Sequence, residues 1–239
     1  MAVCGEKRNN FGLQVSDIPA RRPERKSIEG NFIDLLPLRT EHADELYDVL
    51  GGIEQERASL WDYMFAGPFA VRQTLQNYIA QCAESDDPHF FVIVDKMSRQ
   101  ITGYISLLRI DPTNRVIEVG NVMFSTLLQR TRGATECVYL LAQLVFDDLG
   151  YRRFEWKCNN LNDPSKRAAQ RLGFTFEGIF RQHMIIKGRN RDTAWFSIID
   201  SEWPIVKQAF QAWLDPKNFD EQGRQRQALA DLRNNLLRA

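Results

Sequence analysis

The sequence is poor in the side chains that build metal clusters and disulfide frameworks. Its 239 residues include 4 cysteines and 3 histidines. The cysteines, Cys4, Cys82, Cys137 and Cys158, are far apart, and no two form a Cys-x-x-Cys pair. This spacing argues against a zinc cluster or a disulfide scaffold, and it suits a reducing compartment.

Long apolar runs and an excess of one charge are also missing. No stretch approaches the ~18 uninterrupted apolar residues that a membrane span needs. The first residues have no apolar segment like that of a secretory signal, so we expect a cytoplasmic protein. Lys plus Arg equals Asp plus Glu at 31 each, whereas a dedicated nucleic-acid binder usually needs a strong positive excess.

The rest of the composition, 44% hydrophobic and 26% charged, is that of a globular protein with one large core. We expect three parts: an N-terminal arm over 1–30, a main domain over 31–215 and a charged helical tail over 216–239. The arm has a basic, proline-containing stretch at 19–26 that is draped on the domain, left mobile or used to contact an anionic partner. The tail has few apolar positions, so we expect it to be dispensable for folding, with a homodimer contact as the alternative.

Hydrophobic periodicity and turn signals predict the order β-α-α-β-β-β-α-β-α-β-β-α over 32–214. Strands at 116–125 and 152–158 are joined by a helix that is apolar on nearly every face, so they should be parallel neighbours. The strands at 101–110 and 116–125 instead flank a short turn and form an antiparallel hairpin. The expected fold class is α/β (α+β), a mixed sheet with helices on both faces.

A basic loop lies between the first of these parallel strands and the buried helix. Backbone N–H groups at a helix start can hold a pyrophosphate, and a glycine lets the phosphates approach closely. The loop residues that we expect to form this site are Arg130, Arg132, Gly133, Ala134 and Thr135. Any strand–loop–helix connection can carry a glycine, so a purely structural loop is the alternative.

Two further polar groups lie on or next to the predicted parallel strands. Strand alternation places Glu118 with Val116, Gly120 and Val122, where a carboxylate can act as a base; a solvated Glu is the alternative. After the second strand comes Asn162-x-x-Ser165. The Ser165 hydroxyl either faces a cleft and donates a proton or only caps its helix.

Together these motifs resemble the GNAT superfamily of acetyl-CoA-dependent N-acetyltransferases, and within it the ribosomal-protein alanine and serine N-acetyltransferases. Arg130-x-x-Gly133-x-Thr135 is similar to the pyrophosphate motif Arg/Gln-x-x-Gly-x-Gly/Ala, although Thr135 replaces a smaller residue. Asn162-x-x-Ser165, the Arg-Leu-Gly-Phe run at 171–174 and the Glu-Val-Gly run at 118–120 resemble the same subgroup. The likeness covers roughly residues 30–200.

The resemblance implies a GNAT fold whose sheet splays between the strands at 116–125 and 152–158. A bulge near Val122-Met123 would leave backbone groups free for the pantetheine arm of acetyl-CoA, and Asn162 would contact that arm. A backbone N–H near Val122, Met123 or Phe124 could stabilise the thioester oxygen. Glu118 would take the proton of a primary amine, directly or through water, and Ser165 would protonate the departing thiolate. No metal is required.

The acceptor amine, a small molecule or a protein N-terminus, is not identified by these motifs. The residues that we expect to contact the acceptor are Trp61, Tyr63, Arg181 and Arg191. Two other functions stay open. One is a GNAT-fold module that binds acyl-CoA without catalysis, and the other is nucleic-acid or ribosome binding through the arm and tail, against which the zero net charge weighs.

Overall fold

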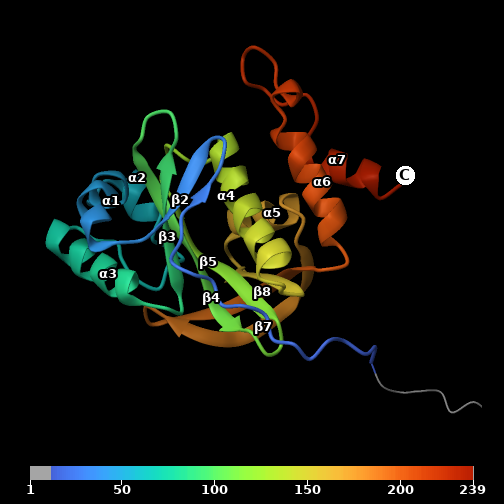
Figure 1. Cartoon of the computed structure of the whole chain (residues 1–239). Coiled ribbons are helices and arrows are strands. Elements are labelled where there is room, and N and C mark those ends of the chain that lie inside the picture. Colours follow the sequence, from blue (N-terminus) through green and yellow to red (C-terminus); the bar gives the residue numbers. More distant parts are fainter. Residues whose placement is uncertain (1–11, 239) are drawn as a thin grey trace, which may run out of the picture.

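An eight-stranded sheet runs through the whole molecule (Figure 1), and the computed structural model describes residues 12–238. The strand order is β1-β2-β3-β4-β5-β6-β8-β7. The strands are β1 (Ile28–Glu29), β2 (Ile33–Pro37), β3 (His89–Asp95), β4 (Ile101–Asp111), β5 (Val116–Phe124), β6 (Arg153–Asn159), β7 (Thr175–Ile186) and β8 (Arg189–Ile199). The helices are α1 (Ala43–Leu50), α2 (Gln55–Ser59), α3 (Arg72–Glu84), α4 (Arg132–Gln143), α5 (Asp163–Arg171), α6 (Trp203–Leu214) and α7 (Leu229–Leu236).

The pairing confirms the predicted mixed sheet. β5 and β6 are parallel, and every other neighbouring pair is antiparallel. The crossover between them is the expected buried helix α4, which continues as a π-helical turn over Leu144–Asp148. The sequence patterns did not indicate that turn, and they also missed the two-residue strand β1 and the short helix α2.

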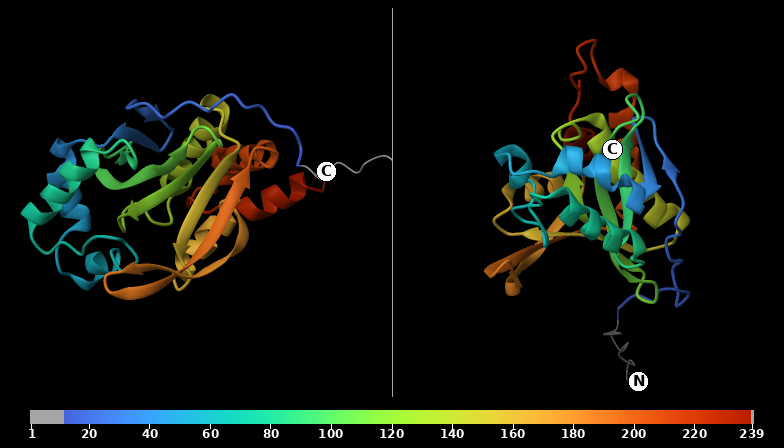
Figure 2. Two further views of the ribbon diagram at one scale, coloured as in Figure 1. Left: turned by 90° about the horizontal axis from the view of Figure 1, so that it is seen from below. Right: turned by 90° about the vertical axis from the view of Figure 1, so that its left-hand side faces the viewer.

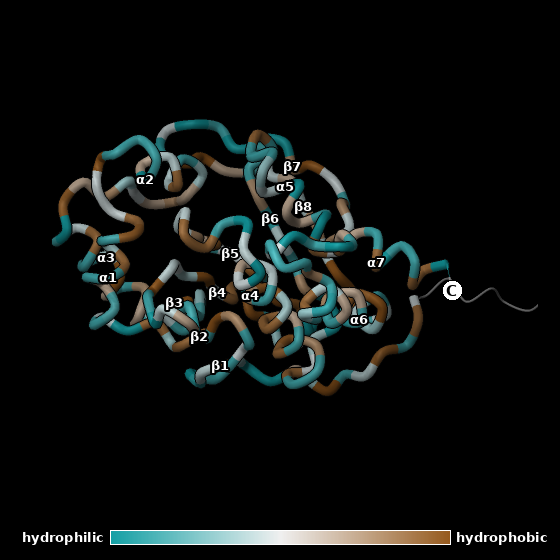
Figure 3. The backbone as a smooth tube through the Cα atoms, turned by 90° about the horizontal axis from the view of Figure 1, so that it is seen from above, coloured by the Kyte–Doolittle hydropathy of each residue, from teal (hydrophilic) through white to brown (hydrophobic). Residues whose placement is uncertain are grey.

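Each face of the sheet packs against its own helices. α4 and α6 cover one face, where they form the larger core with side chains such as Ile117, Phe154 and Phe210. α1 and α3 cover β2–β4 on the opposite face, where a second core surrounds Trp61 and Tyr104. In Figure 3 brown, hydrophobic segments are concentrated in the middle of the molecule, near β4 and α4, and many of the outer segments are teal.

The second face is covered over only part of its width. α1–α3 stop short of β6, β7 and β8, and the β7–β8 hairpin reaches back toward the α2–α3 loop (Figure 2). Lys187 Nζ, in the turn of this hairpin, donates to the Trp61 carbonyl at 2.8 Å. From the same α2–α3 loop, Tyr63 Oη donates to the carbonyl of Leu161, in the turn between β6 and α5, at 3.1 Å. The helices on one side and the hairpin on the other therefore enclose the middle of the sheet.

Residues 20–30 of the predicted arm lie against the domain, and residues 12–19 are exposed. Residues 1–11, including Cys4, are outside the described part of the chain. The Ala20 and Arg21 N–H groups donate to the carbonyls of Pro112 and Leu149, at 2.9 and 3.0 Å. Arg25 reaches the Ala83 carbonyl at 2.7 Å. From Ala20 onward the draped arrangement is the one observed, and two of the four basic residues at 19–26, Arg21 and Arg25, contact the domain.

The C-terminal segment is packed rather than loosely attached. Leu229 is 2% exposed and belongs to the larger core. Asn218 Nδ2 donates to the carbonyls of Trp213 and Gln227, at 3.2 and 3.1 Å. Arg233 donates to the last carbonyls of α5 at 3.3 Å. The prediction that this segment is dispensable therefore disagrees with its burial, because Leu229 is in the core and Leu232 and Leu236 pack against it.

None of the described helices combines the length and the apolar character needed to cross a membrane.

Replacing Leu229 by alanine should lower the free energy of unfolding by about 2–4 kcal/mol, because a fully buried leucine leaves a cavity. Leu237 is a matched control, since it is a leucine of the same segment that is 62% exposed. Leu237→Ala should change stability by less than about 0.5 kcal/mol. Urea denaturation measures both. Equal, small effects would show that the C-terminal segment does not contribute to the core.

Candidate active site

A V-shaped opening forms where the two parallel strands separate. β5 and β6 are paired only from Val116–Arg153 to Val119–Trp156. Beyond these pairs, β6 continues to pair with β8, and β5 with β4, so the edges that face each other have no strand partner among the described residues. Unpaired backbone N–H and C=O groups are costly when they are buried, so these two edges can bind an extended ligand through hydrogen bonds.

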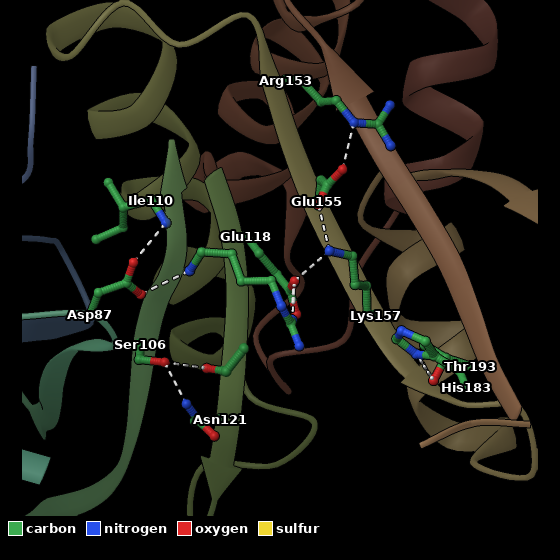
Figure 4. Close-up of polar contacts among 12 residues, drawn as sticks. Asp87, Ser106, Ile110, Glu118, Asn121, Arg153, Glu155, Lys157, His183 and Thr193 are labelled. Atoms are coloured by element: carbon green, nitrogen blue, oxygen red, sulfur yellow. Dashed lines mark hydrogen bonds and ion pairs between the residues drawn. The ribbon is translucent and has the colours of Figure 1, made fainter. Parts of the chain in front are cut away.

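A β-bulge at Asn121 shapes the β5 side of the opening. Tyr104 and Ser106 of β4 pair with Met123 and Gly120, so β5 carries one extra residue. Asn121 has a φ of +48°, and its Nδ2 donates to Ser106 Oγ, which donates to the Gly120 carbonyl (Figure 4). The predicted bulge near Val122-Met123 therefore lies at Asn121.

The bulge also changes which face each later residue of β5 occupies. Val122 packs against the larger core and Met123 belongs to the second, so strict alternation, which grouped Val122 with Glu118, is wrong beyond Gly120. Val122 lines the cleft, whereas Met123 and Phe124 are paired with β4 and do not line it.

Glu118 lies in this cleft, 3% exposed, with both of its cationic partners on one carboxylate oxygen. Arg109 Nη1 is 2.5 Å and Lys157 Nζ is 2.8 Å from Oε2. The other oxygen, Oε1, accepts no hydrogen bond from the described residues; it lies on the Gly120 side, 3.6 Å from where a Cβ at that glycine would be. One oxygen is thus held in place, and the other can accept a proton from a ligand.

Arg109 reaches Glu118 because β4 is also bulged. Arg109 has a φ of +48°, and the β4–β5 register shifts between Leu108 and Asp111. Asp87, in the loop before β3, holds the distorted backbone: its carboxylate accepts from the N–H groups of Arg109 and Ile110 at 2.8 and 3.0 Å (Figure 4). A left-handed residue in a strand is costly, and these charge-assisted bonds offset the cost.

From Glu118 a chain of alternating charges crosses β6 toward the sheet edge (Figure 4). Lys157 Nζ also contacts Glu155 at 2.7 Å, and Arg153 joins Glu155 to Glu177 at 2.7 and 2.5 Å. Hydrogen bonds to Glu177 raise the pKa of Arg153, and the same contact lowers the pKa of Glu177. Counting Arg109 and Glu118, the chain has three cations and three carboxylates, so its formal charges cancel.

Ser165 lies on the β6 side of the cleft. Trp156 Nε1 donates to Ser165 Oγ at 3.0 Å, which leaves the hydroxyl hydrogen free to be donated elsewhere. Asn162 Oδ1 accepts from the Ser165 N–H at 3.1 Å and caps α5, and both residues line the cleft. The helix cap is therefore made by Asn162, and the Ser165 side chain is not needed for it. Cys158 is beside them, and burial raises the pKa of its thiol.

The basic loop does precede α4, and its arginines differ in environment. Thr131 caps the helix by accepting from the Ala134 N–H at 3.2 Å. Arg130 is exposed, with a φ of +63°. The Arg132 guanidinium lies over two aromatic rings, 4.6 Å from the centre of Phe32 and 4.7 Å from that of Phe219.

Packing accounts for two other residues of the motif. A Cβ on Gly133 would lie 2.7 Å from Ile33 Cγ2, so the glycine lets α4 approach β2. Thr135 is buried, and its Oγ1 accepts from Arg171 at 2.8 Å. The side chain that replaces the smaller residue of the GNAT motif therefore faces the interior.

Of the four residues expected to contact the acceptor, two line the cleft and two do not. Trp61 is 0% exposed and donates through Nε1 to the Leu50 carbonyl at 2.9 Å, so its side chain is part of the core. Arg181 is exposed and does not line the cleft. Tyr63 and Arg191 line it, although one is in a loop and the other on β8.

Sequence reasoning missed several residues of the cleft, chiefly Arg109, Lys157, Asn121 and Phe65. Lys157 carried a usable signal, because it is a charged residue on the second predicted parallel strand, as Glu118 is on the first. Arg109 carried no such signal, since only the bulge in β4 aims it at the cleft.

Comparison with known proteins agrees with this geometry. The acetyltransferase (GNAT) domain family model matches residues 33–175. A GCN5-related N-acetyltransferase structure from Brucella melitensis is 49% identical, with a TM-score of 0.88, over 91% of this chain and 98% of that one. The microcin C7 self-immunity acetyltransferase MccE, solved with acetyl-CoA and AMP, is 26% identical, with a TM-score of 0.62, over 71% and 93% of the two chains.

Among curated proteins, the chain is 26% identical over 103 residues to YdaF of Bacillus subtilis (strain 168), which is provisionally named as a ribosomal N-acetyltransferase. This match covers 43% of the chain and spans 56% of that relative's length. The family model and the near-complete coverage of the Brucella melitensis structure confirm the resemblance seen in the sequence. The chain belongs to the GNAT family of acetyltransferases.

Proposed function

We propose that this protein is an acetyl-CoA-dependent N-acetyltransferase that transfers an acetyl group to a primary amine. The main support is the juxtaposition, in one cleft, of two unpaired strand edges, the free Oε1 of Glu118 and the Ser165 hydroxyl. The acceptor is a small molecule or a protein N-terminus.

The cleft fits the parts of acetyl-CoA. The open edges of β5 and β6 would bind the amide groups of its pantetheine arm, Asn162 would contact that arm, and the N-terminus of α4 with Arg130 would hold its pyrophosphate. Bound acetyl-CoA would supply a thioester whose acyl carbon is open to attack by an amine.

Each proton in the reaction has a residue that can hold it. Glu118 Oε1 takes one proton from the ammonium form of the acceptor, directly or through water, and so frees the nitrogen lone pair. As the N–C bond forms and the C–S bond breaks, the sulfur leaves with the bonding electron pair. Ser165 Oγ donates its proton to that sulfur, and the second proton that the attacking nitrogen loses as the amide forms returns to Ser165 through water. A backbone N–H at the β5 bulge near Val122 stabilises the charge on the thioester oxygen.

Coenzyme A should stabilise the folded protein. At ~100 times its dissociation constant a ligand adds about 2.7 kcal/mol to the free energy of unfolding. Arg130→Ala should reduce the thermal shift because the exposed guanidinium is free to pair with phosphate. Arg132→Ala is the matched control: it should lower the melting temperature of the free protein, since it removes the stacking on Phe32 and Phe219, and retain most of the shift. No shift with wild-type protein would contradict the cosubstrate assignment.

Glu118→Gln should lower kcat by ~10²–10⁴-fold while leaving acetyl-CoA affinity nearly unchanged, because it removes a base and keeps the shape. The control is Glu155→Gln, which neutralises the other carboxylate on Lys157 but lies outside the cleft lining. It should change kcat less than about tenfold. Thiol release from acetyl-CoA, followed over a panel of amines and peptides, measures both. Near-wild-type turnover by Glu118→Gln would rule out the general-base role.

Ser165→Ala should lower kcat less than Glu118→Gln does, by about tenfold or less, because water can protonate a thiolate whose conjugate acid has a pKa of ~8–9. The loss should grow as the pH rises, since fewer solvent protons are then available. A loss as large as that of Glu118→Gln, at every pH, would assign Ser165 a different role.

A non-catalytic acyl-CoA-binding module is the alternative. It predicts the same thermal shift with coenzyme A, but no thiol release with any amine of the panel.

A further inference from the structure

Arg191 is a buried cation whose hydrogen-bonding capacity is largely unused. Its side chain lines the cleft, and the residue is 6% exposed. Nε donates to Thr193 Oγ1 at 3.1 Å, and the guanidinium carbon lies 5.5 Å from the centre of the Phe65 ring. A guanidinium has five N–H donors, and the other four have no acceptor among residues 12–238.

The charge of Arg191 is also uncompensated. The neighbouring cations, Arg109 and Lys157, are paired within the neutral chain described above. No carboxylate lies within 4.0 Å of Arg191 among the described ion pairs, although Glu118 is near enough to attract it. Arg191 together with this chain therefore has one excess positive charge, and removing such a charge from water is costly unless it finds a partner.

Burial lowers the pKa of Arg191, which is the direction expected when a cation loses water and gains no anion. Stacking on Phe65 and one bond to a hydroxyl satisfy only part of such a group. Arginine presents a planar fork that matches a carboxylate with two parallel N–H···O bonds. The missing partner is thus an anion that enters the cleft.

We propose that Arg191 binds a carboxylate of the acceptor, so that the substrate class is amines that carry a carboxylate a few atoms from the reacting nitrogen. This inference rests on the proposed function. The two ends of such a molecule match the two free groups of the cleft: the ammonium group reaches Glu118 Oε1, and the carboxylate reaches the Arg191 fork. A free amino acid and an acidic peptide N-terminus share this chemistry.

Binding of product-like probes tests the proposal without turnover. The probes are N-acetylglycine, N-acetyl-β-alanine and N-acetyl-γ-aminobutyrate, each against its own carboxamide, so that charge changes while shape is kept. A peptide pair, N-acetyl-Gly-Asp-Gly-amide and N-acetyl-Gly-Asn-Gly-amide, distinguishes the peptide source from the amino-acid source. Calorimetric titration is run with and without coenzyme A, so a failure of coenzyme A to bind, which would overturn the proposed function, leaves the charge preference measurable.

The wild-type protein should bind at least one acid ~10- to 100-fold more tightly than its amide, as expected for a charge-assisted, two-bond contact. Arg191→Gln should reduce that ratio to near one, and Arg191→Lys should restore part of it, because the charge returns without the fork. Arg189→Gln is the matched control, an exposed arginine two residues away on the same strand, and should keep the wild-type ratio.

The comparison of acid and amide binding by the wild-type protein needs no variant, so the proposal can still be tested if Arg191→Gln fails to fold. Equal binding of acids and amides, or binding of no acid, would overturn the proposal. So would a charge preference that persists in folded Arg191→Gln. A preference for the acid that is seen only with the amino-acid probes, or only with the peptide pair, supports the proposal and identifies the source of the carboxylate.

Discussion

The loss of pairing between β5 and β6 is the constraint on which the site depends. Two parallel strands that stayed paired over their full lengths would satisfy each other's backbone and leave no room for a ligand. Here pairing ends at Val119 and Trp156, while β4 and β8 continue to hold the outer edges of the two strands. Each side of the opening is therefore held by a neighbouring strand, and the unpaired backbone of β5 and β6 faces the opening. The catalytic candidates, Glu118 and Ser165, both line the cleft at this opening.

Charge compensation makes it feasible to bury so many ionisable groups in the middle of a sheet. Glu118 has two cationic partners, and the chain of charges continues through Lys157 to the outer strands. Breaking one such pair leaves the other group buried and unpaired, so these side chains are strongly coupled. The same chain leaves Oε1 of Glu118 without a hydrogen bond from the described residues, and it does not compensate the charge of Arg191. A neutral chain of charges with one carboxylate oxygen free of hydrogen bonds and one unpaired guanidinium is the basis of the proposed acceptor, which is itself both cationic and anionic.

Much of the architecture was predictable from local patterns. The hairpin at 101–124, the crossover helix and the pair of parallel strands follow from turn residues and hydrophobic periodicity, because these signals act over short distances. Motif resemblance added the splay and placed Glu118, Asn162 and Ser165 near one another. The patterns failed where packing decides the outcome. Trp61 is a core residue, Gly133 is required by Ile33, and the leucine-poor C-terminal segment is buried through Leu229.

The sequence by itself determined most of the secondary structure, the family and the candidate residues Glu118 and Ser165, since each depends on residue type and spacing along the chain. Tertiary structure alone decided which of the candidates meet. A single extra residue at Asn121 moves Val122 to the opposite face, and a second bulge, held by Asp87, aims Arg109 at Glu118. The partners of a buried charge come from distant strands, so whether Arg191 is compensated depends on their three-dimensional arrangement and has no signature in local sequence.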